Sequence, residues 1–114
     1  MHEYGISTAL VEAVTARAAS IGARRVVAIH LAVGERAGIA ETALRSCFDL
    51  VSADTPAAGA RLALRRRPLV FHCAACEADY AVHGDAFACP SCGAYGALVD
   101  AADDLVLERI EVER

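Results

Sequence analysis

The spacing of hydrophobic residues predicts a helix followed by a strand at the start of the chain. Between Glu3 and Ile21, apolar residues recur at three- and four-residue steps, as on one face of an amphipathic helix. The residues of this face are Ile6, Leu10, Val14, Ala18 and Ile21. Gly22 follows where a helix C-cap is expected, and residues 26–33 are almost all β-branched or aliphatic, which is typical of a strand.

A second helix and a second strand are predicted next. Helical spacing recurs at Ala40, Leu44, Cys47, Phe48 and Val51. This helix is expected to end before Thr55-Pro56, because proline restricts the residue that precedes it. In residues 60–67, leucines alternate with arginines or alanine, which predicts a strand with one solvated face that ends at Pro68.

The pattern changes between residues 70 and 98. This segment has no helical periodicity and contains four of the five cysteines together with several glycines. Residues 105–112 then return to a strand-like pattern of aliphatic and charged positions. We expect this last strand to rejoin the first sheet, so that the cysteine-rich segment is an insertion into one larger domain.

Composition and charge exclude several classes of protein. A chain of 114 residues with 56% hydrophobic residues suffices for one core and a smaller module, not for a large catalytic architecture. The formal net charge of −4 disfavours a general nucleic-acid binder, which is expected to be basic. We expect no membrane segment, because no stretch approaches about 18 uninterrupted apolar residues. We also expect a cytoplasmic protein, because Met1-His2-Glu3-Tyr4 lacks the basic start of a signal peptide.

The cysteines follow the spacing of a metal site. Cys73 and Cys76 form one Cys-x-x-Cys pair, and Cys89 and Cys92 form a second pair after twelve intervening residues. Each pair can place two sulfurs on one cation, and we expect residues 80–82 and 86–88 to form a hairpin between the pairs. Four thiolates close a tetrahedral coordination sphere, which predicts a structural Zn²⁺ site without a catalytic role. Iron in a rubredoxin-like site would use the same ligands and stays as an alternative.

Other chemically active residues have simpler interpretations. Cys47 lies on the apolar side of the second predicted helix and is interpreted as a small buried hydrophobic residue. His30, His72 and His83 are interpreted as structural or surface residues, and the Arg65–Arg67 run as a solvated surface. We find no constellation of base and nucleophile, and we therefore predict that the protein is not an enzyme.

The second residue of the chain has chemical meaning. A terminal amine, adjacent backbone amide nitrogens and the imidazole of His2 can chelate one metal ion in fused small rings. Nitrogen-rich planar sets of this kind suit Ni²⁺ or Cu²⁺ better than Zn²⁺, which prefers a tetrahedron. Because a helix begins within a few residues, this chelate would lie at a structured end of the protein.

The combination of these motifs resembles the HypA/HybF family of nickel metallochaperones. The resemblance rests on Met1-His2-Glu3 opening a helix, on a strand that ends in Val33-Gly34, and on Cys73-x-x-Cys76 paired with Cys89-Pro-x-Cys92-Gly93. It spans nearly the whole chain. The sequence departs from the family pattern after the second cysteine, where glycine is common and Glu77 stands here.

The resemblance implies an α+β fold with two domains. The nickel-binding domain, two helices on a small mixed or antiparallel sheet, would comprise residues 1–69 and be completed by 99–114; an inserted zinc-ribbon-like domain with four cysteine ligands would comprise 70–98. The family delivers Ni²⁺ as cargo during maturation of nickel–iron hydrogenase and, in some organisms, urease. By resemblance, His2 matches the nickel-binding histidine, Glu3 an auxiliary nickel ligand, and Cys73, Cys76, Cys89 and Cys92 the Zn²⁺ ligands.

The resemblance also implies partners. These are a HypB-type GTPase, the precursor of the hydrogenase large subunit, and urease maturation proteins; neither nucleic acid nor a membrane is expected. The competing hypothesis is a zinc-ribbon module for protein or nucleic-acid interaction without a nickel function. Such a nucleic-acid module would need basic charge and exposed aromatic side chains, whereas this segment offers only Tyr80, Phe87 and Tyr95.

Overall fold

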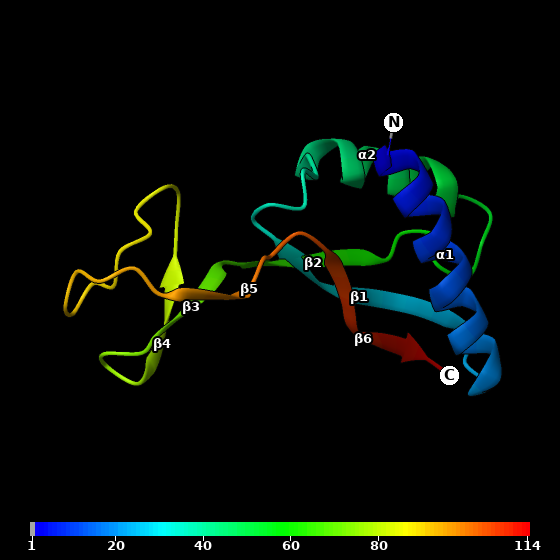
Figure 1. Ribbon diagram of the computed structural model, residues 1–114. Coiled ribbons are helices and arrows are strands. Elements are labelled where there is room, and N and C mark those ends of the chain that lie inside the picture. Colours follow the sequence, from blue (N-terminus) through cyan, green and yellow to red (C-terminus); the bar gives the residue numbers. More distant parts are fainter. Residues whose placement is uncertain (1) are drawn as a thin grey trace. The chain divides into compact units, whose positions relative to one another are not determined.

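The computed structural model describes residues 2–114 and contains two helices and six strands in that range (Figure 1). In chain order these are α1 (His2–Ser20), β1 (Arg25–Gly34), α2 (Glu41–Ser52), β2 (Arg61–Arg67), β3 (Leu69–Cys73), β4 (Ala78–Val82), β5 (Ala97–Asp100) and β6 (Leu105–Glu113). No helix in residues 2–114 is long and apolar enough to cross a membrane.

The chain forms two compact units. Unit 1 contains the residues up to Leu31 together with Ile39–Arg65 and Val106–Arg114, and unit 2 contains Ala32–Gly38 and Arg66–Leu105. The four cysteines of the two pairs all lie in unit 2. The sequence predicts domain boundaries at residues 69/70 and 98/99. These domain boundaries stay a prediction.

One sheet has the strand order β2-β1-β6, so the predicted return of the last strand to the first sheet is confirmed. The amide of Arg24 donates to Glu113 and that of Gly34 donates to Asp104, so β6 runs antiparallel to β1. The amides of Val26 and Glu35 donate to Pro56 and Arg67 respectively, so β2 runs in the same direction as β1. The sheet is therefore mixed, with α2 in the connection between its two parallel strands.

The helix α1 packs against α2 and contributes to the core of unit 1. Leu10, Val14 and Ala18 are buried as the predicted stripe requires, but Ser7 and Val11 are buried too. The hydroxyl of Ser7 donates to the carbonyl oxygen of Leu44 at 3.4 Å, which satisfies this buried group at the contact of the two helices. The buried face of α1 is therefore wider than the periodicity indicated, and Ile6 and Ile21 at its edges are only half-buried.

The end of α1 follows the predicted capping motif. Gly22 has a φ of 70°, and the amide of Ala23 donates to the carbonyl oxygen of Ala18 at 2.9 Å. This is a Schellman cap, in which glycine takes the left-handed conformation that other residues adopt at a cost. The strand β1 that follows is buried along most of its length, as expected for the central strand of the sheet.

The second sheet has the order β4-β3-β5 and lies in unit 2. Both pairs are antiparallel, with Phe71 opposite Tyr80 on one side and Leu98 on the other. The predicted hairpin between residues 80–82 and 86–88 is wrong, because β4 pairs with β3 and the segment 86–88 contributes only a bridge between Ala88 and Tyr95. The turn that holds the first cysteine pair itself joins β3 to β4, which makes this hairpin more local than the one predicted.

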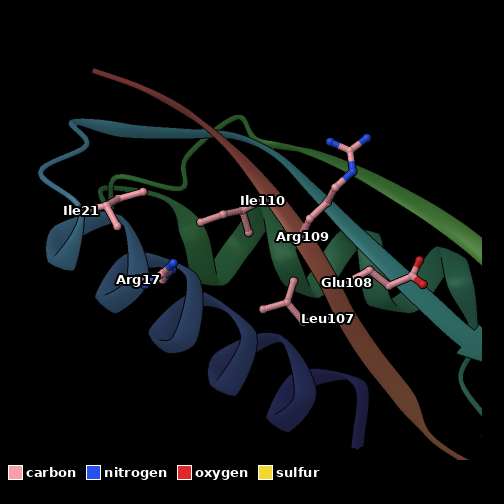
Figure 2. A pocket seen from close by; sticks show the side chains of 6 residues that line it. All are labelled: Arg17, Ile21, Leu107, Glu108, Arg109 and Ile110. Atoms are coloured by element: carbon pink, nitrogen blue, oxygen red, sulfur yellow. The ribbon is translucent and has the colours of Figure 1, made fainter.

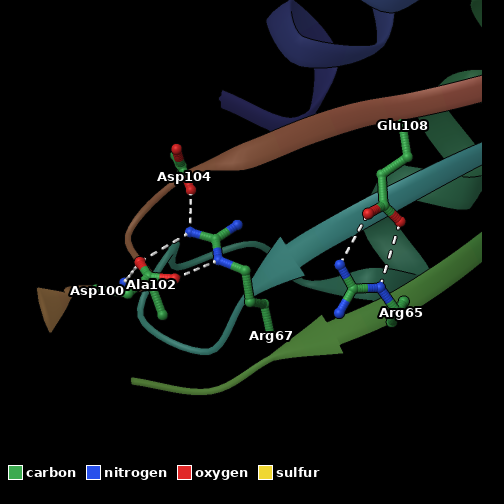
Figure 3. A network of polar contacts seen from close by, with 6 residues as sticks. All are labelled: Arg65, Arg67, Asp100, Ala102, Asp104 and Glu108. Atoms are coloured by element: carbon green, nitrogen blue, oxygen red, sulfur yellow. Dashed lines mark hydrogen bonds and ion pairs between the residues drawn. The ribbon is translucent and has the colours of Figure 1, made fainter. Parts of the chain in front are cut away.

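Salt bridges account for two of the three consecutive arginines (Figure 3). In unit 2, Arg67 binds the carboxylates of Asp100, with Nε to Oδ2 at 2.9 Å, and of Asp104. In unit 1, Arg65 donates from Nη2 to Glu108 at 2.8 Å, across the sheet. The Arg65–Arg67 run therefore joins strands and loops and is more than the solvated surface that was predicted.

Gly34 is required by close packing in unit 2. A Cβ atom added there would lie 2.1 Å from the carbonyl oxygen of Ala102. Ala102 is fully buried and has a φ of 51°, and its carbonyl oxygen accepts from the amide of Arg36 at 2.8 Å. The backbone of the loop before β6 therefore passes directly over the end of β1, where only glycine leaves room.

Candidate metal sites

The four paired cysteines converge on one point in unit 2. Cys73 ends β3, and Cys76 lies in the turn that leads to β4, whereas Cys89 and Cys92 lie in the loop before β5. All four Sγ atoms lie within 4.8 Å of one another. The Sγ atoms of Cys73 and Cys92 are 3.6 Å apart, and those of Cys76 and Cys89 are 3.9 Å apart.

These separations fit a tetrahedral zinc ion. With a Zn–S distance of about 2.3 Å, the edge of a sulfur tetrahedron is about 3.8 Å. The Cys73–Cys92 and Cys76–Cys89 separations lie on either side of this value. Cys73 and Cys89 are buried, whereas Cys76 and Cys92 are exposed. Four thiolates at these positions would hold Zn²⁺ in a closed structural site, and no other His, Cys, Asp or Glu cluster of comparable closeness occurs in residues 2–114.

The backbone of each cysteine turn continues into the left-handed region. Gly93 follows the second pair with a φ of 79°, and Glu77 follows the first pair with a φ of 54°. Glu77 is the position at which the sequence departs from the glycine expected by resemblance. The structure shows the reason for that expectation, since a residue with a side chain adopts this conformation at an energetic cost.

Hydrogen bonds prepare one of the thiols for metal binding. Backbone amides of Cys92 and Ser91 lower the pKa of the Cys89 thiol to about 7, because they stabilise its thiolate. Hydrogen bonds with the thiols of Cys92, Cys73 and Cys89 raise the pKa of Cys76 to about 12, because they favour its protonated form and so penalise ionisation. A divalent cation would remove this penalty, since a coordinating thiol is deprotonated outright.

Tyr80 links the cysteine loop to the sheet. It is 9% exposed, and its hydroxyl donates to the carbonyl oxygen of Phe87 at 2.8 Å and accepts from the amide of Gly96 at 2.9 Å. Phe87 precedes the second cysteine pair and Gly96 follows it, so one phenol fastens both ends of the loop. From the sequence, Tyr80 was expected only as an aromatic residue of the module and as part of the predicted hairpin, because nothing local in the sequence indicates these two partners.

The second predicted site lies at the first turn of α1. The side chain of His2 is exposed, and its Nδ1 atom lies 3.5 Å from Oε2 of Glu3. The same carboxylate oxygen accepts from the amide of Ala40 at 3.0 Å, and this hydrogen bond holds the pKa of Glu3 below its usual value. The amine of Met1, which completes the predicted chelate, lies outside the described residues.

The remaining histidines all pair with carboxylates. Nε2 of His30 lies 2.6 Å from Glu111, Nδ1 of His72 lies 2.8 Å from Asp79, and Nδ1 of His83 lies 2.7 Å from Glu35. The side chain of His30 is half-buried, whereas those of His72 and His83 are exposed. Cys47 is half-buried on α2 and has no disulfide partner.

A pocket lies in unit 1 between α1 and β6 (Figure 2). Its volume is about 530 Å³. Leu107 and Ile110 of β6 extend toward α1, where Arg17 and Ile21 complete the lining together with Glu108 and Arg109. None of these residues is a predicted metal ligand, so the pocket is separate from the chemistry of both candidate sites.

The fold and the two sites define a small α+β metal-binding protein with a four-cysteine cluster. A family model described as "Hydrogenase/urease nickel incorporation, metallochaperone, hypA" matches residues 1–112. Hydrogenase maturation factor HypA of Dehalococcoides mccartyi is 37% identical over 99% of this chain and 95% of its own length. The HypA of Geobacter metallireducens is also 37% identical, over 99% of this chain and all of its own length.

Two solved structures share the fold. The solution structure of a HypA protein matches with a TM-score of 0.71 at 18% identity, covering 98% of this chain and 96% of its own. The solution structure of the nickel metallochaperone HypA from Helicobacter pylori matches with a TM-score of 0.67 at 16% identity, covering 97% of each chain. The chain belongs to the HypA family of nickel-incorporating metallochaperones.

Proposed function

We propose that this metallochaperone takes up Ni²⁺ through His2 and the backbone nitrogens beside it, with Glu3 as an auxiliary group, and releases it to the hydrogenase maturation machinery. Family membership supports nickel incorporation as the function, and the observation that carries the site is the contact between His2, Glu3 and the amide of Ala40. Cys73, Cys76, Cys89 and Cys92 would hold Zn²⁺ permanently as a structural ion.

The position of Glu3 supports a role at the nickel site. A chelate that uses the amide nitrogen of His2 and its own ring closes a six-membered ring only through Nδ1. That atom lies 3.5 Å from Oε2 of Glu3, so an ion bound to Nδ1 would be within reach of this carboxylate. Because the Ala40 amide keeps Glu3 ionised, its negative charge would partly compensate the charge of the cation.

The helix start offers further ligands. The first amides of a helix have no intrahelical acceptor, so the backbone nitrogen of His2 is not needed by α1. Nitrogen ligands in one plane suit Ni²⁺, and a site at the exposed end of a helix is accessible for ligand exchange with a partner. The exposed imidazole of His2 would thus be both the anchor for the ion and the group from which a partner removes it.

The experiment that tests this site measures nickel and zinc separately on untagged protein. We expect the wild type to bind one zinc and one nickel ion, His2→Ala to lose nickel but keep zinc, and Glu3→Gln to bind nickel more weakly. His83→Ala is the matched control, because it removes another exposed imidazole paired with a glutamate. Stoichiometric nickel in His2→Ala, or equal nickel loss in both histidine variants, would contradict the assignment.

The partners proposed for the chain are those that the resemblance implies. They are a HypB-type GTPase, the hydrogenase large-subunit precursor and urease maturation proteins, all encountered in the cytoplasm. In this scheme the GTPase hydrolyses nucleotide and this chain has no enzymatic activity. A zinc-ribbon module without nickel function is not favoured, because the nickel-incorporation family model matches residues 1–112. A nucleic-acid module would in addition need basic charge, whereas the net charge is −4.

A further inference from the structure

The two units differ in charge. Unit 1 carries eight arginines and eight carboxylates, whereas unit 2 carries seven carboxylates and only the arginines Arg36, Arg66 and Arg67. The whole formal charge of −4 therefore belongs to unit 2. A zinc ion with four thiolates would add about two more negative charges to the same unit. The negative charge of unit 2 will therefore attract basic partners and repel acidic ones.

Apolar side chains are exposed on this acidic unit. Leu98 and Val99 of β5 are 54% and 58% exposed, and Tyr95, just before the strand, is 80% exposed. Three large apolar residues within five positions are more than the scattered exposure that is normal for a soluble protein. β5 is also an edge strand of its sheet (Figure 1).

Leu98 continues the aromatic row of the sheet to its edge. Tyr80, Phe71 and Leu98 lie directly opposite one another on β4, β3 and β5. The rings of Phe71 and Tyr80 stack with centroids 5.9 Å apart. Exposure rises along this row from 9% at Tyr80 to 54% at Leu98, so the row ends in an uncovered side chain.

Val99 is the extra residue of a bulge. The register of β3 and β5 shifts between Val70 and Phe71, which face Asp100 and Leu98 respectively, so Val99 has no partner on β3. A bulge redirects side chains and interrupts the ladder that an added strand would need. The edge therefore presents its side chains to a partner and is not suited to regular strand addition.

Negative charge lies near the C-terminal end of β5. Asp79 lies in the cross-strand row of His72 and Ala97, but it belongs to β4 at the other edge of the sheet and pairs there with Nδ1 of His72 at 2.8 Å. Asp103 is exposed and lies three residues after the end of the strand. Asp100, at the end of the strand, and Asp104 share the single positive charge of Arg67, so the three side chains together keep one net negative charge.

We propose that Tyr95, Leu98 and Val99 form a docking surface for a basic, apolar segment of another protein, in which apolar side chains cover β5 and a flanking arginine or lysine approaches Asp103. The charge of unit 2 selects this occupant over a neutral or acidic one. The surface belongs to unit 2 alone and does not depend on the nickel site at His2.

The test uses the full zinc-loaded chain and three short peptides with a common Val-Leu-Ile core, flanked by arginine, serine or glutamate pairs. Amide NMR spectra are expected to show that the arginine-flanked peptide shifts residues 95–100 and binds at least about tenfold more tightly than the glutamate-flanked one. The double variant Leu98→Ser/Val99→Ser should lose most of this affinity while keeping its zinc. Leu50→Ser, which replaces a 71% exposed leucine on α2, is the control that should bind as the wild type does.

Three outcomes would overturn the proposal. Equal affinity for the three peptides would show that charge does not select the partner. The absence of shifts at residues 95–100 would show that the peptide does not bind at β5. Shifts at these residues that depend on protein concentration without peptide would show that a second copy covers β5. None of these outcomes affects the His2→Ala nickel measurement, so this proposal and the nickel site can fail independently.

Discussion

Replacing Tyr80 by phenylalanine tests whether one hydroxyl group holds the cysteine loop in place. The ring and its packing against Phe71 stay, and only the hydroxyl is lost. That hydroxyl makes two hydrogen bonds, to the carbonyl oxygen of Phe87 and from the amide of Gly96. Each such bond contributes about 1 kcal/mol net, so the variant should lose about 2 kcal/mol, and more where the freed backbone groups cannot reach water.

The expected readout is zinc affinity. A segment of this size cannot bury enough apolar surface to fold alone, so its folding free energy appears in the free energy of metal binding. A loss of about 2 kcal/mol then corresponds to about a thirtyfold weaker zinc affinity. Competition with a chromophoric chelator measures this directly on the full chain, and thermal unfolding of the zinc-loaded protein gives an independent value.

Tyr95→Phe is the matched control, because it removes the same hydroxyl from a side chain that is 80% exposed. Its zinc affinity should stay within about threefold of the wild type, since a solvated hydroxyl contributes little. If Tyr80→Phe behaves like this control, the hydroxyl does not fasten the loop, and the sheet and the cysteine cluster are not coupled through it.

Three further outcomes are expected. Cys76→Ser should lose zinc and the ordered structure of unit 2, whereas the helical signal of α1 should stay. Metal analysis and circular dichroism measure these two effects, and retained zinc or a lost helical signal would contradict the prediction. Gly5→Ala should stabilise α1 by about 0.5–1 kcal/mol in chemical unfolding, because an added Cβ meets no atom within 4 Å and alanine favours helices. Arg65→Gln should raise the pKa of Glu108, which hydrogen bonds from Arg65 hold below 4.5. This pair therefore stabilises the fold above about pH 4.5 and not in acid. An unchanged pKa of Glu108 in an NMR titration of Arg65→Gln would contradict the prediction, as would a variant that is destabilised as much in acid as at neutral pH.

The local pattern was sufficient for the first unit. The helices and strands of residues 2–67 form where the periodicity of 3.6 or 2 residues predicts them, because one face of each element must be buried. Gly22 ended α1 as a cap because glycine alone adopts its conformation without strain. The pairing of β4 was predicted wrongly, since the segment 86–88 has strand-like residues but the turn at Cys73–Cys76 offers β4 a closer partner in β3.

The ligand chemistry follows from the order of residues along the chain. The spacing of the four cysteines predicts a metal cluster because each pair reaches one ion through a local turn. The position of His2 beside the terminal amine predicts a nitrogen-rich chelate in the same way. The distant groups that contact the predicted ligands and their loops became visible only in the folded molecule: the Tyr80 hydroxyl on both ends of the cysteine loop and the Ala40 amide on Glu3. The uncovered edge at Leu98 also became visible only there. Such contacts join residues far apart in the chain, and no local periodicity carries information about them.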